Sequence, residues 1–393
     1  MARTAAGRWL YRLTHRLKKA VKGTLLPCSM FEGMGFQYMG PVDGHDVKTL
    51  TRLLVYASKV NGPVLLRVKT IKGKGYPPAE KNPDAFHGIG PFHKETGALI
   101  TSKTAETFSS RFGHDLTELA KQDQRICAIT AAMTSGTGLA AFSKAFPDRF
   151  FDVGIAEEHA VTMAAGMAKQ GLIPVFAVYS TFFQRSYDML IHDIAIDHIH
   201  AVFGIDRAGL VGDDGETHHG LFDLGFLQTI PGITVLCPAS LDELSDMLER
   251  AVHRMDGPVA VRYPRGGEDF YSENHSDAPD YLLKDGTDLT IVTFGTLTGN
   301  CLAVADRLQQ EGISAQVLKL NQLVPLPTEL ALDCLSKTKR LLVAEECITQ
   351  GSPGQGILAA AAQSGLTLEG VAVCSCGKDF VPHGTIPQLR SLC

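Results

Sequence analysis

Several charged and aromatic residues of the chain follow short apolar runs, at the points where β-strands would end. Glu157 and Glu158 come just after FFDVGI, Tyr179 closes IPVFAVY, and Arg265 follows PVAVRYP. In an open parallel sheet, ligands bind outside the carboxyl ends of the strands. The pattern therefore predicts a small-molecule site to which several loops of one sheet contribute.

The segment FDVGIAEEHAV places carboxylates where a strand becomes a helix. Residues 160–168 are rich in strong helix formers, so Glu157 and Glu158 fall in the first helical turn. The helix dipole stabilises any negative charge there. Position alone therefore fits a purely structural carboxylate as well as a catalytic one.

The string DRAGLVGDDGETHHG, at residues 206–220, concentrates acids and histidines in a glycine-flanked loop. Taken alone, carboxylate and imidazole groups at this density suggest a metal site. The suggestion is weak, because neither a His-x-x-x-His helix pair nor a cysteine partner accompanies the loop. Asp214 and His218 remain candidates for other chemistry.

A third segment, YSTFFQRSYDMLIHD, is aromatic. By burial statistics, Tyr179, Phe182, Phe183 and Tyr187 would be ordinary core residues. Arg265, in VRYPRG, would by the same reasoning be a solvated arginine after an edge strand. Residue type therefore leaves the structural and functional interpretations of this segment open.

In this order, the segments resemble the 1-deoxy-D-xylulose-5-phosphate synthase family, thiamine-diphosphate enzymes of the transketolase superfamily. The resemblance runs from about Gly23 to Gly384 and includes KGKGYPPAEKNPDAFHG at residues 72–88. The 206–220 loop is its most specific part. That loop and the arginines of the two neighbouring segments argue against a split transketolase subunit or a pyruvate dehydrogenase beta subunit.

The resemblance implies roles for individual residues. Glu157 would hydrogen-bond the aminopyrimidine ring of thiamine diphosphate and so promote loss of the proton from the thiazolium carbon of the cofactor. Phe182 would stack on the aminopyrimidine ring, and Tyr76 would also contact the cofactor. The residues that the family places around the reacting centre are His87, Asp214 and His218. The implied substrate-binding residues are Tyr179, Arg185, Arg207 and Arg265, of which Arg185 and Arg265 would bind a phosphate. His219 falls where the family usually has glutamine and receives no role.

The implied reaction joins pyruvate to glyceraldehyde 3-phosphate with loss of CO₂, through an enamine of thiamine diphosphate. Its product is a precursor of isoprenoids, thiamine and pyridoxal. The family holds the cofactor's diphosphate through Mg²⁺ bound by a Gly-Asp-Gly motif and an asparagine, a combination missing from this sequence. We therefore expect no metal ligands in these residues, and either a homodimer or association with an amino-terminal subunit. A non-catalytic remnant that binds a partner subunit is the alternative outside enzymology.

The elements that must position these residues alternate between apolar runs and helical stretches, which predicts an α/β fold with parallel sheets. We expect a remnant of a diphosphate-binding domain with its connection over residues 1–100, where GPVDGHD reads as a turn, 47–59 as a helix and 63–70 as a strand. A pyrimidine-binding domain over 101–266, a linker over 267–286 and a carboxyl-terminal domain over 287–393 follow.

Composition narrows the class of protein. The 393 residues carry a net charge of −5 with 37 basic and 42 acidic side chains, which argues against nucleic-acid binding. Nine scattered cysteines fit a reducing cytoplasm, and no apolar run is long enough to span a membrane. The basic start of the chain, before Glu32, fits either an organellar transit peptide or an amphipathic helix packed on the protein.

Overall fold

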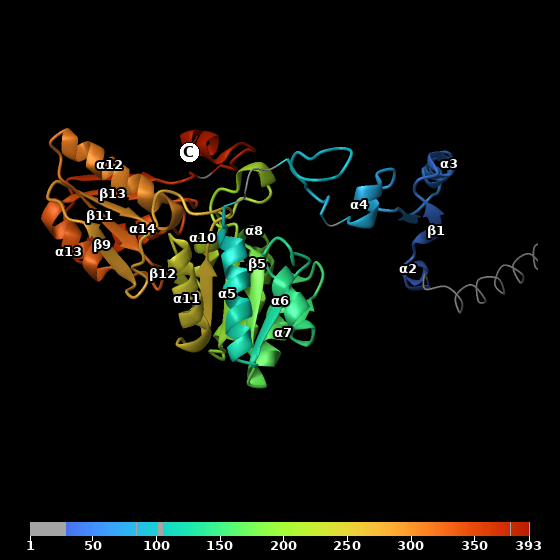
Figure 1. Cartoon of the computed structure of the whole chain (residues 1–393), viewed down its shortest axis with the longest axis horizontal. Coiled ribbons are helices and arrows are strands. Elements are labelled where there is room, and N and C mark those ends of the chain that lie inside the picture. The colour runs from blue at the N-terminus through green and yellow to red at the C-terminus, as the bar shows by residue number, and fades with distance from the viewer. Residues whose placement is uncertain (1–28, 84, 101–104, 378, 393) are drawn as a thin grey trace, which may run out of the picture. The chain divides into compact units, whose positions relative to one another are not determined.

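The computed structural model describes residues 29–83, 85–100, 105–377 and 379–392, so the basic start of the chain lies outside the described residues. The chain divides into two compact units, residues 1–104 and 105–393 (Figure 1). No helix in the described ranges is long and apolar enough to cross a membrane.

The first unit contains one small parallel sheet of two strands. Its elements are α2 (Ser29–Gly33), β1 (Gln37–Asp43), α3 (Val47–Ala57), β2 (Val64–Lys69) and α4 (Pro77–Lys81). The helix and strand predicted over 47–59 and 63–70 are confirmed. The turn predicted for GPVDGHD is wrong at its start, because the residues GPVD belong to β1. A register shift between Met39 and Val42 accommodates Pro41, which has no amide to donate to the ladder.

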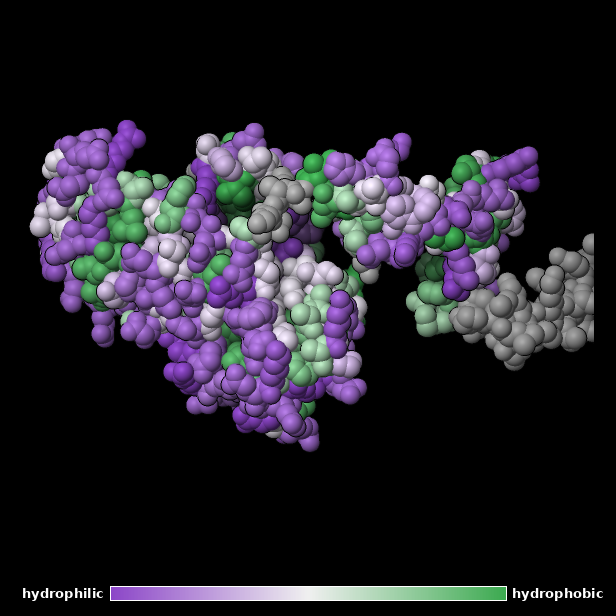
Figure 2. Space-filling view, in the orientation of Figure 1, coloured by the Kyte–Doolittle hydropathy of each residue, from purple (hydrophilic) through white to green (hydrophobic). Residues whose placement is uncertain are grey.

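Burial in this first unit is sparse. No residue of α3 is buried, and four of its apolar side chains are at least half exposed: Val47, Leu54, Val55 and Tyr56. Figure 2 shows apolar surface on this unit among hydrophilic side chains. Val64, Leu65 and Leu66 of β2 are partly covered. The amphipathic pattern of α3 thus has little within the unit to pack against.

The second unit begins with a seven-stranded sheet in the order β12-β7-β8-β6-β5-β3-β4, in which every neighbouring pair except β12 and β7 is parallel. Its strands are β3 (Ile126–Thr130), β4 (Phe150–Asp152), β5 (Ile173–Tyr179), β6 (Ala201–Asp206), β7 (Thr234–Leu236), β8 (Pro258–Arg262) and β12 (Gln322–Val324). The helical segments before and between these strands are α5 (Phe108–Gln122), α6 (Ala140–Ala145), η1 (Pro147–Arg149), α7 (Glu157–Lys169), α8 (Ser180–Phe183), η2 (Gln184–Ser186), α9 (Tyr187–Met189), η3 (Leu190–Ala195), η4 (Gly212–Asp214), α10 (Asp223–Leu227) and α11 (Leu241–His253).

Both faces of this sheet are covered. Every residue of β3, β6 and β8 is buried. Side chains of one strand alternate between two separate apolar clusters, as Phe176 and Val178 of β5 belong to one and Val175 and Ala177 to the other. Near-continuous apolar strands of this kind are typical of parallel sheets with helices on both faces. The predicted fold class is confirmed.

A five-stranded sheet in the order β14-β13-β10-β11-β9 completes the second unit. Its elements are β9 (Asp280–Lys284), β10 (Leu289–Thr293), η5 (Gly295–Leu297), α12 (Thr298–Gln310), β11 (Ala315–Leu320), α13 (Glu329–Thr338), β13 (Arg340–Ala344), α14 (Pro353–Gln363), β14 (Gly370–Cys374) and α15 (Ile386–Leu392). Residues 280–284, which the sequence analysis assigned to a linker, instead form the antiparallel edge strand β9. β12 follows β11 in the sequence but pairs with β7, so the carboxyl-terminal part of the chain supplies an edge strand to the seven-stranded sheet.

A buried ionic pair joins the five-stranded sheet to helix α11, which packs on the seven-stranded sheet. Lys319 Nζ on β11 lies 2.5 Å from Glu243 Oε1 on α11, and both side chains are fully buried. The Glu243 carboxylate also accepts from the His275 amide, within the segment expected to be a linker. Desolvation lowers the pKa of Lys319, and the Glu243 charge opposes that shift. This part of the linker is thus packed into the second unit.

Candidate active site

Glu157, the predicted cofactor carboxylate, is the first residue of α7 and follows β4 across a short turn. Its side chain is 3% exposed, and its Oε2 lies 2.8 Å from Nη1 of Arg185, whose side chain is 45% exposed. The same oxygen has no well-aligned hydrogen-bond donor in the structure. Buried carboxylate oxygens normally have one. Glu157 therefore keeps acceptor capacity for a bound group.

The contact with Glu157 gives Arg185 a partner that the sequence analysis did not anticipate. Arg185 lies in η2, one helical turn after Phe182, and its guanidinium faces a carboxylate. A guanidinium has five N–H donors, so one contact leaves others for a ligand. Its phosphate-binding role stays a prediction.

Three rings meet at the end of β5. Tyr179, the last residue of β5, stacks on Phe182 of α8 with ring centroids 5.9 Å apart and planes at 23°. His218 approaches Phe182 edge-on, at 5.4 Å and 77°. The strand end, the short helix and the 206–220 loop thus form one aromatic surface of the kind on which a planar heterocycle stacks.

Arg207 lies against the other partner of that stack. Its guanidinium carbon is 3.8 Å from the Tyr179 ring centroid, and its Nη1 donates to the Gly136 carbonyl at 2.8 Å. The backbone of Arg207 has a φ of +60°, a value that residues other than glycine rarely adopt. A Cβ on Gly136 would lie 1.7 Å from the Tyr179 hydroxyl. Only glycine permits this close approach.

Asp214 lies between two arginines. Its Oδ2 is 3.6 Å from Arg207 Nε and 3.3 Å from Arg265 Nε. Arg265 also donates through Nη1 to the Val211 carbonyl at 3.0 Å, and its side chain is 39% exposed. The structure thus joins Arg265 to Asp214 and Arg207, and Arg185 to Glu157. The expected phosphate clamp of Arg185 and Arg265 stays a prediction.

Sequence reasoning missed Asp206, the last residue of β6. Its fully buried Oδ1 lies 3.1 Å from Arg207 Nη1, and neither carboxylate oxygen has a well-aligned donor. Burial raises its pKa to about 6, against the opposing effect of Arg207. Burial also raises the pKa of Tyr179, which Arg207 opposes. The available signal was position, since Asp206 ends a strand directly before Arg207.

Tyr76 and His87 lie in the first unit. The Tyr76 hydroxyl donates to the Lys94 carbonyl at 2.9 Å, and its ring packs edge-on against Phe86 at 5.5 Å. His87 is exposed. Their approach to the residues of the second unit stays a prediction.

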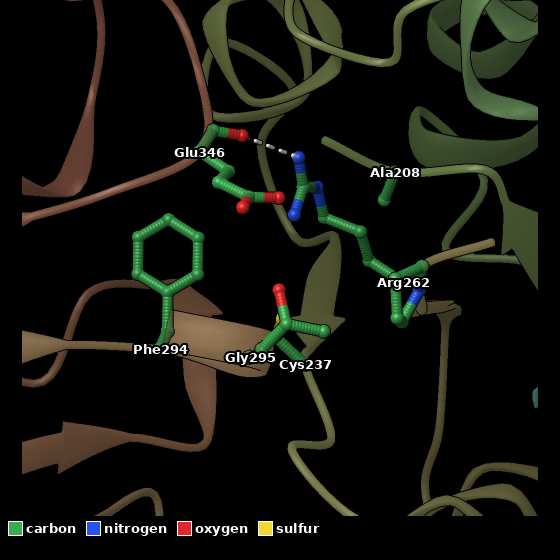
Figure 3. Close-up of a pocket in the computed structure, with 8 residues that line it drawn as sticks. Ala208, Cys237, Arg262, Phe294, Gly295 and Glu346 are labelled. Carbon is green, nitrogen blue, oxygen red and sulfur yellow. Dashed lines mark hydrogen bonds between the residues drawn. The ribbon is translucent and has the colours of Figure 1, made fainter. Parts of the chain in front are cut away.

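A small cavity between the two sheets is a separate feature (Figure 3). It measures about 10 Å³, and Arg262, Phe294 and Glu346 are among its lining residues. Arg262 points across it and donates to the Glu346 carbonyl at 3.3 Å (Figure 3). The space fits roughly one water molecule, and none of the predicted site residues lines it.

The metal interpretation of the 206–220 loop gains no support. Asp214 faces arginines rather than other ligands. Across the ranges that the structure describes, no group of three or more His, Cys, Asp or Glu side chains is arranged to hold a metal ion.

Three family models match the chain. The model for "1-deoxy-D-xylulose-5-phosphate synthase" matches residues 1–70, that for the transketolase pyrimidine binding domain matches 106–267, and that for the transketolase C-terminal domain matches 281–393.

Curated relatives extend over nearly the whole chain. It is 44% identical to 1-deoxy-D-xylulose-5-phosphate synthase 1 of Geobacter sulfurreducens, over 98% of this chain and 62% of the relative. The synthase of Desulfitobacterium hafniense strain Y51 is also 44% identical, over 98% of this chain and 61% of the relative. The chain thus spans about three fifths of the length of the relatives it matches.

Solved structures support the same fold. A split-gene transketolase whose title reads "inactive beta4 tetramer" superposes with a TM-score of 0.64 at 27% identity, covering 73% of this chain and 92% of that one. A transketolase of Pichia stipitis with sedoheptulose 7-phosphate gives 0.60 at 18% identity, over 74% of this chain and 44% of that one, and supports the fold alone.

Fold and domain matches together define the class as the transketolase superfamily of thiamine-diphosphate-dependent transferases. Within that class, the chain belongs to the 1-deoxy-D-xylulose-5-phosphate synthase family.

Proposed function

We propose that the chain carries the pyrimidine-binding half of a 1-deoxy-D-xylulose-5-phosphate synthase, which condenses pyruvate with glyceraldehyde 3-phosphate and releases CO₂. The observation that carries the proposal is the continuous set of contacts from Phe182 through Tyr179, Arg207 and Asp214 to Arg265. An aromatic platform thus continues into a cationic surface suited to a phosphorylated aldehyde.

The residues present fit the pyrimidine end of thiamine diphosphate. Glu157 offers a buried carboxylate oxygen without a well-aligned donor, and Phe182 offers a ring already held in a stack. When bound, the cofactor supplies a nucleophilic carbon that can add to pyruvate and stabilise the charge left by decarboxylation. Glu157 would hold a ring nitrogen of the pyrimidine, and burial keeps water from competing for that contact.

The substrates would be held by the cationic part of the site. Arg265 has a partly exposed side chain beside Asp214 and is assigned to the phosphate of glyceraldehyde 3-phosphate. Arg185 is assigned as the second phosphate ligand, and Tyr179 and Arg207 as contacts to the rest of the substrate. His218, beside Phe182, is assigned with Asp214 to the reacting centre.

Diphosphate binding requires groups beyond these. Hard cations such as Mg²⁺ take oxygen ligands, commonly one or two carboxylates with phosphate oxygens. A stack and one hydrogen bond contribute only about 1.5–4 kcal/mol, which corresponds to binding weaker than millimolar. We therefore propose that a polypeptide of these 393 residues needs an added diphosphate-binding segment for turnover.

The assay combines the chain with the diphosphate-binding segment of a relative, thiamine diphosphate and Mg²⁺, and follows 1-deoxy-D-xylulose 5-phosphate by chromatography. Arg265→Ala should raise the KM for glyceraldehyde 3-phosphate by about tenfold or more, and that for pyruvate by less than about threefold. Equal increases for both substrates would remove the phosphate assignment.

A split-transketolase subunit is the second candidate, favoured by the likeness to the split-gene transketolase. The same assay separates the two, because a transketolase would transfer a two-carbon unit from a ketose phosphate and would not release CO₂ from pyruvate. Failure of the combined proteins in both reactions, with no thiamine-diphosphate binding, would favour the non-catalytic remnant.

A further inference from the structure

His219 is a buried side chain that the proposed function leaves without a role. It is 3% exposed and ends the 206–220 loop, next to Gly220, whose backbone pairs with Gly209 in both directions at 2.9 and 2.8 Å. Those paired glycines close the loop at its base. A buried imidazole at this point must have its ring nitrogens satisfied.

Both nitrogens of His219 contact backbone groups. Nδ1 accepts from the Val211 amide at 3.2 Å, and Nε2 lies 3.2 Å from the Pro382 carbonyl oxygen. An amide can only donate and a carbonyl can only accept. The contacts therefore select the neutral imidazole with its proton on Nε2, as a bridge between two backbone segments.

The Val211 end of this bridge reaches the site. Val211 is 1% exposed, and its carbonyl accepts from Arg265 Nη1 at 3.0 Å. Arg265 also forms an ion pair with Asp214, through Nε. The amide of Val211 is thus fixed by His219, while its carbonyl fixes the arginine assigned to the substrate phosphate.

The Pro382 end belongs to residues 379–392, here called the carboxyl-terminal segment. Its Val381 and Leu389 pack in one apolar cluster with Leu210 and Leu221, of which Leu221 lies two residues after His219. Arg390 anchors the segment through a 2.7 Å bond from Nε to Glu346 Oε1. The segment is therefore a fixed support for the loop.

We propose that His219 is a positioning residue, which couples the carboxyl-terminal segment to Val211 and thereby holds Arg265 in place for the phosphate of the substrate. The proposal rests on the function proposed above. It adds an explanation of how the phosphate-binding arginine is held in position. A glutamine carries one acceptor and one donor at comparable reach, so it can form the same bridge. Leucine matches the size but can form neither contact.

The test compares His219→Leu with His219→Gln in the chain combined with a diphosphate-binding segment. His219→Leu should raise the KM for glyceraldehyde 3-phosphate about tenfold while the KM for pyruvate changes less than about threefold. His219→Gln should stay within about threefold of the parent for both. His192→Leu, at an exposed position, is the matched control.

A merely structural role would lower kcat or stability in both variants and leave the two KM values in proportion. That result, or a His219→Gln variant as impaired as His219→Leu, would overturn the proposal. Amide exchange in the 393-residue chain tests the bridge without turnover. Faster exchange at Val211 and in residues 379–392 is expected for His219→Leu alone, so a failure of the proposed function is distinguishable. Unchanged exchange in that variant would also overturn it.

Discussion

The two compact units differ in how firmly they hold the residues assigned to one reaction. In the second unit, Tyr179 ends a strand with parallel neighbours on both sides, and Glu157 begins a helix packed on the same sheet. In the first unit, Tyr76 and His87 follow a two-stranded sheet, and the amphipathic helix α3 buries no residue. Side chains are held precisely when packed elements restrict their rotamers.

The comparison separates two kinds of site residue. Those of the second unit already contact one another, and their geometry follows from a complete core. Those of the first unit lie in a unit whose helix α3 and small sheet leave apolar surface and strand edges exposed, features that favour association with another polypeptide. Substitutions in the two units should therefore have effects of different size and kind.

The largest expected effect is on catalysis, at Glu157. In the chain combined with a diphosphate-binding segment, Glu157→Gln should lower kcat by about 10²–10⁴-fold, the usual contribution of acid–base groups. Glu158→Gln, in the same helical turn, is the matched control and should stay within about threefold. Equal losses in the two variants would mean that the first turn of α7 matters only structurally.

Next in size is the buried pair between the two sheets of the second unit. Lys319→Met leaves Glu243 charged and buried without its partner, and should lower the free energy of unfolding by about 3–5 kcal/mol. Chemical denaturation followed by circular dichroism measures this. The double variant Lys319→Met, Glu243→Gln should recover part of the loss. A single variant as stable as the parent would show that the pair does not join the sheets.

The pH dependence of stability tests the environment of Asp206. Its pKa is 3.8 as the ordinary value and about 6 in the fold, so the folded protein binds the proton more tightly. Stability from this group is then present at low pH and is lost as the pH rises from about 4 to 6. Asp206→Asn should gain roughly 2 kcal/mol relative to the parent between pH 4 and 7. A constant difference between the two proteins would contradict the burial of an ionisable carboxyl.

The smallest expected effect is in the first unit. Leu54→Ala, on the exposed face of α3, should change the free energy of unfolding by less than about 0.5 kcal/mol. Leu116→Ala, in the core of the second unit, should cost about 2–5 kcal/mol. With the diphosphate-binding segment added, a larger loss from Leu54→Ala would indicate that α3 is then covered.

Much of the fold of the second unit could be predicted from the sequence, because strands that are buried on both faces are continuous apolar runs. The residues after those runs, such as Glu157 and Arg265, follow from the same rule. Strand β12 was missed because its partner β7 lies far away in the sequence, so no local pattern reveals the pairing. The prediction of a linker was wrong at residues 280–284, which form β9. This edge strand is partly exposed along its length.

Contacts between side chains also could not be predicted from the sequence. The motif predicts that Arg185 and Glu157 serve one site, but their direct contact at 2.8 Å depends on the folded structure. Asp206 was missed because the identity of a residue does not reveal whether its carboxyl will be desolvated. His219 received no role for a similar reason, since both its partners are backbone groups.

Release of CO₂ from pyruvate tests the central claim most directly. Purified chain of these 393 residues would be given thiamine diphosphate, Mg²⁺, pyruvate and glyceraldehyde 3-phosphate, with and without the diphosphate-binding segment of a relative. We predict turnover only when the segment is present, with a kcat of about 1–10³ s⁻¹, the range typical of enzymes. Turnover in that range by the chain alone would contradict the account, because other residues would then have to bind the metal and the diphosphate.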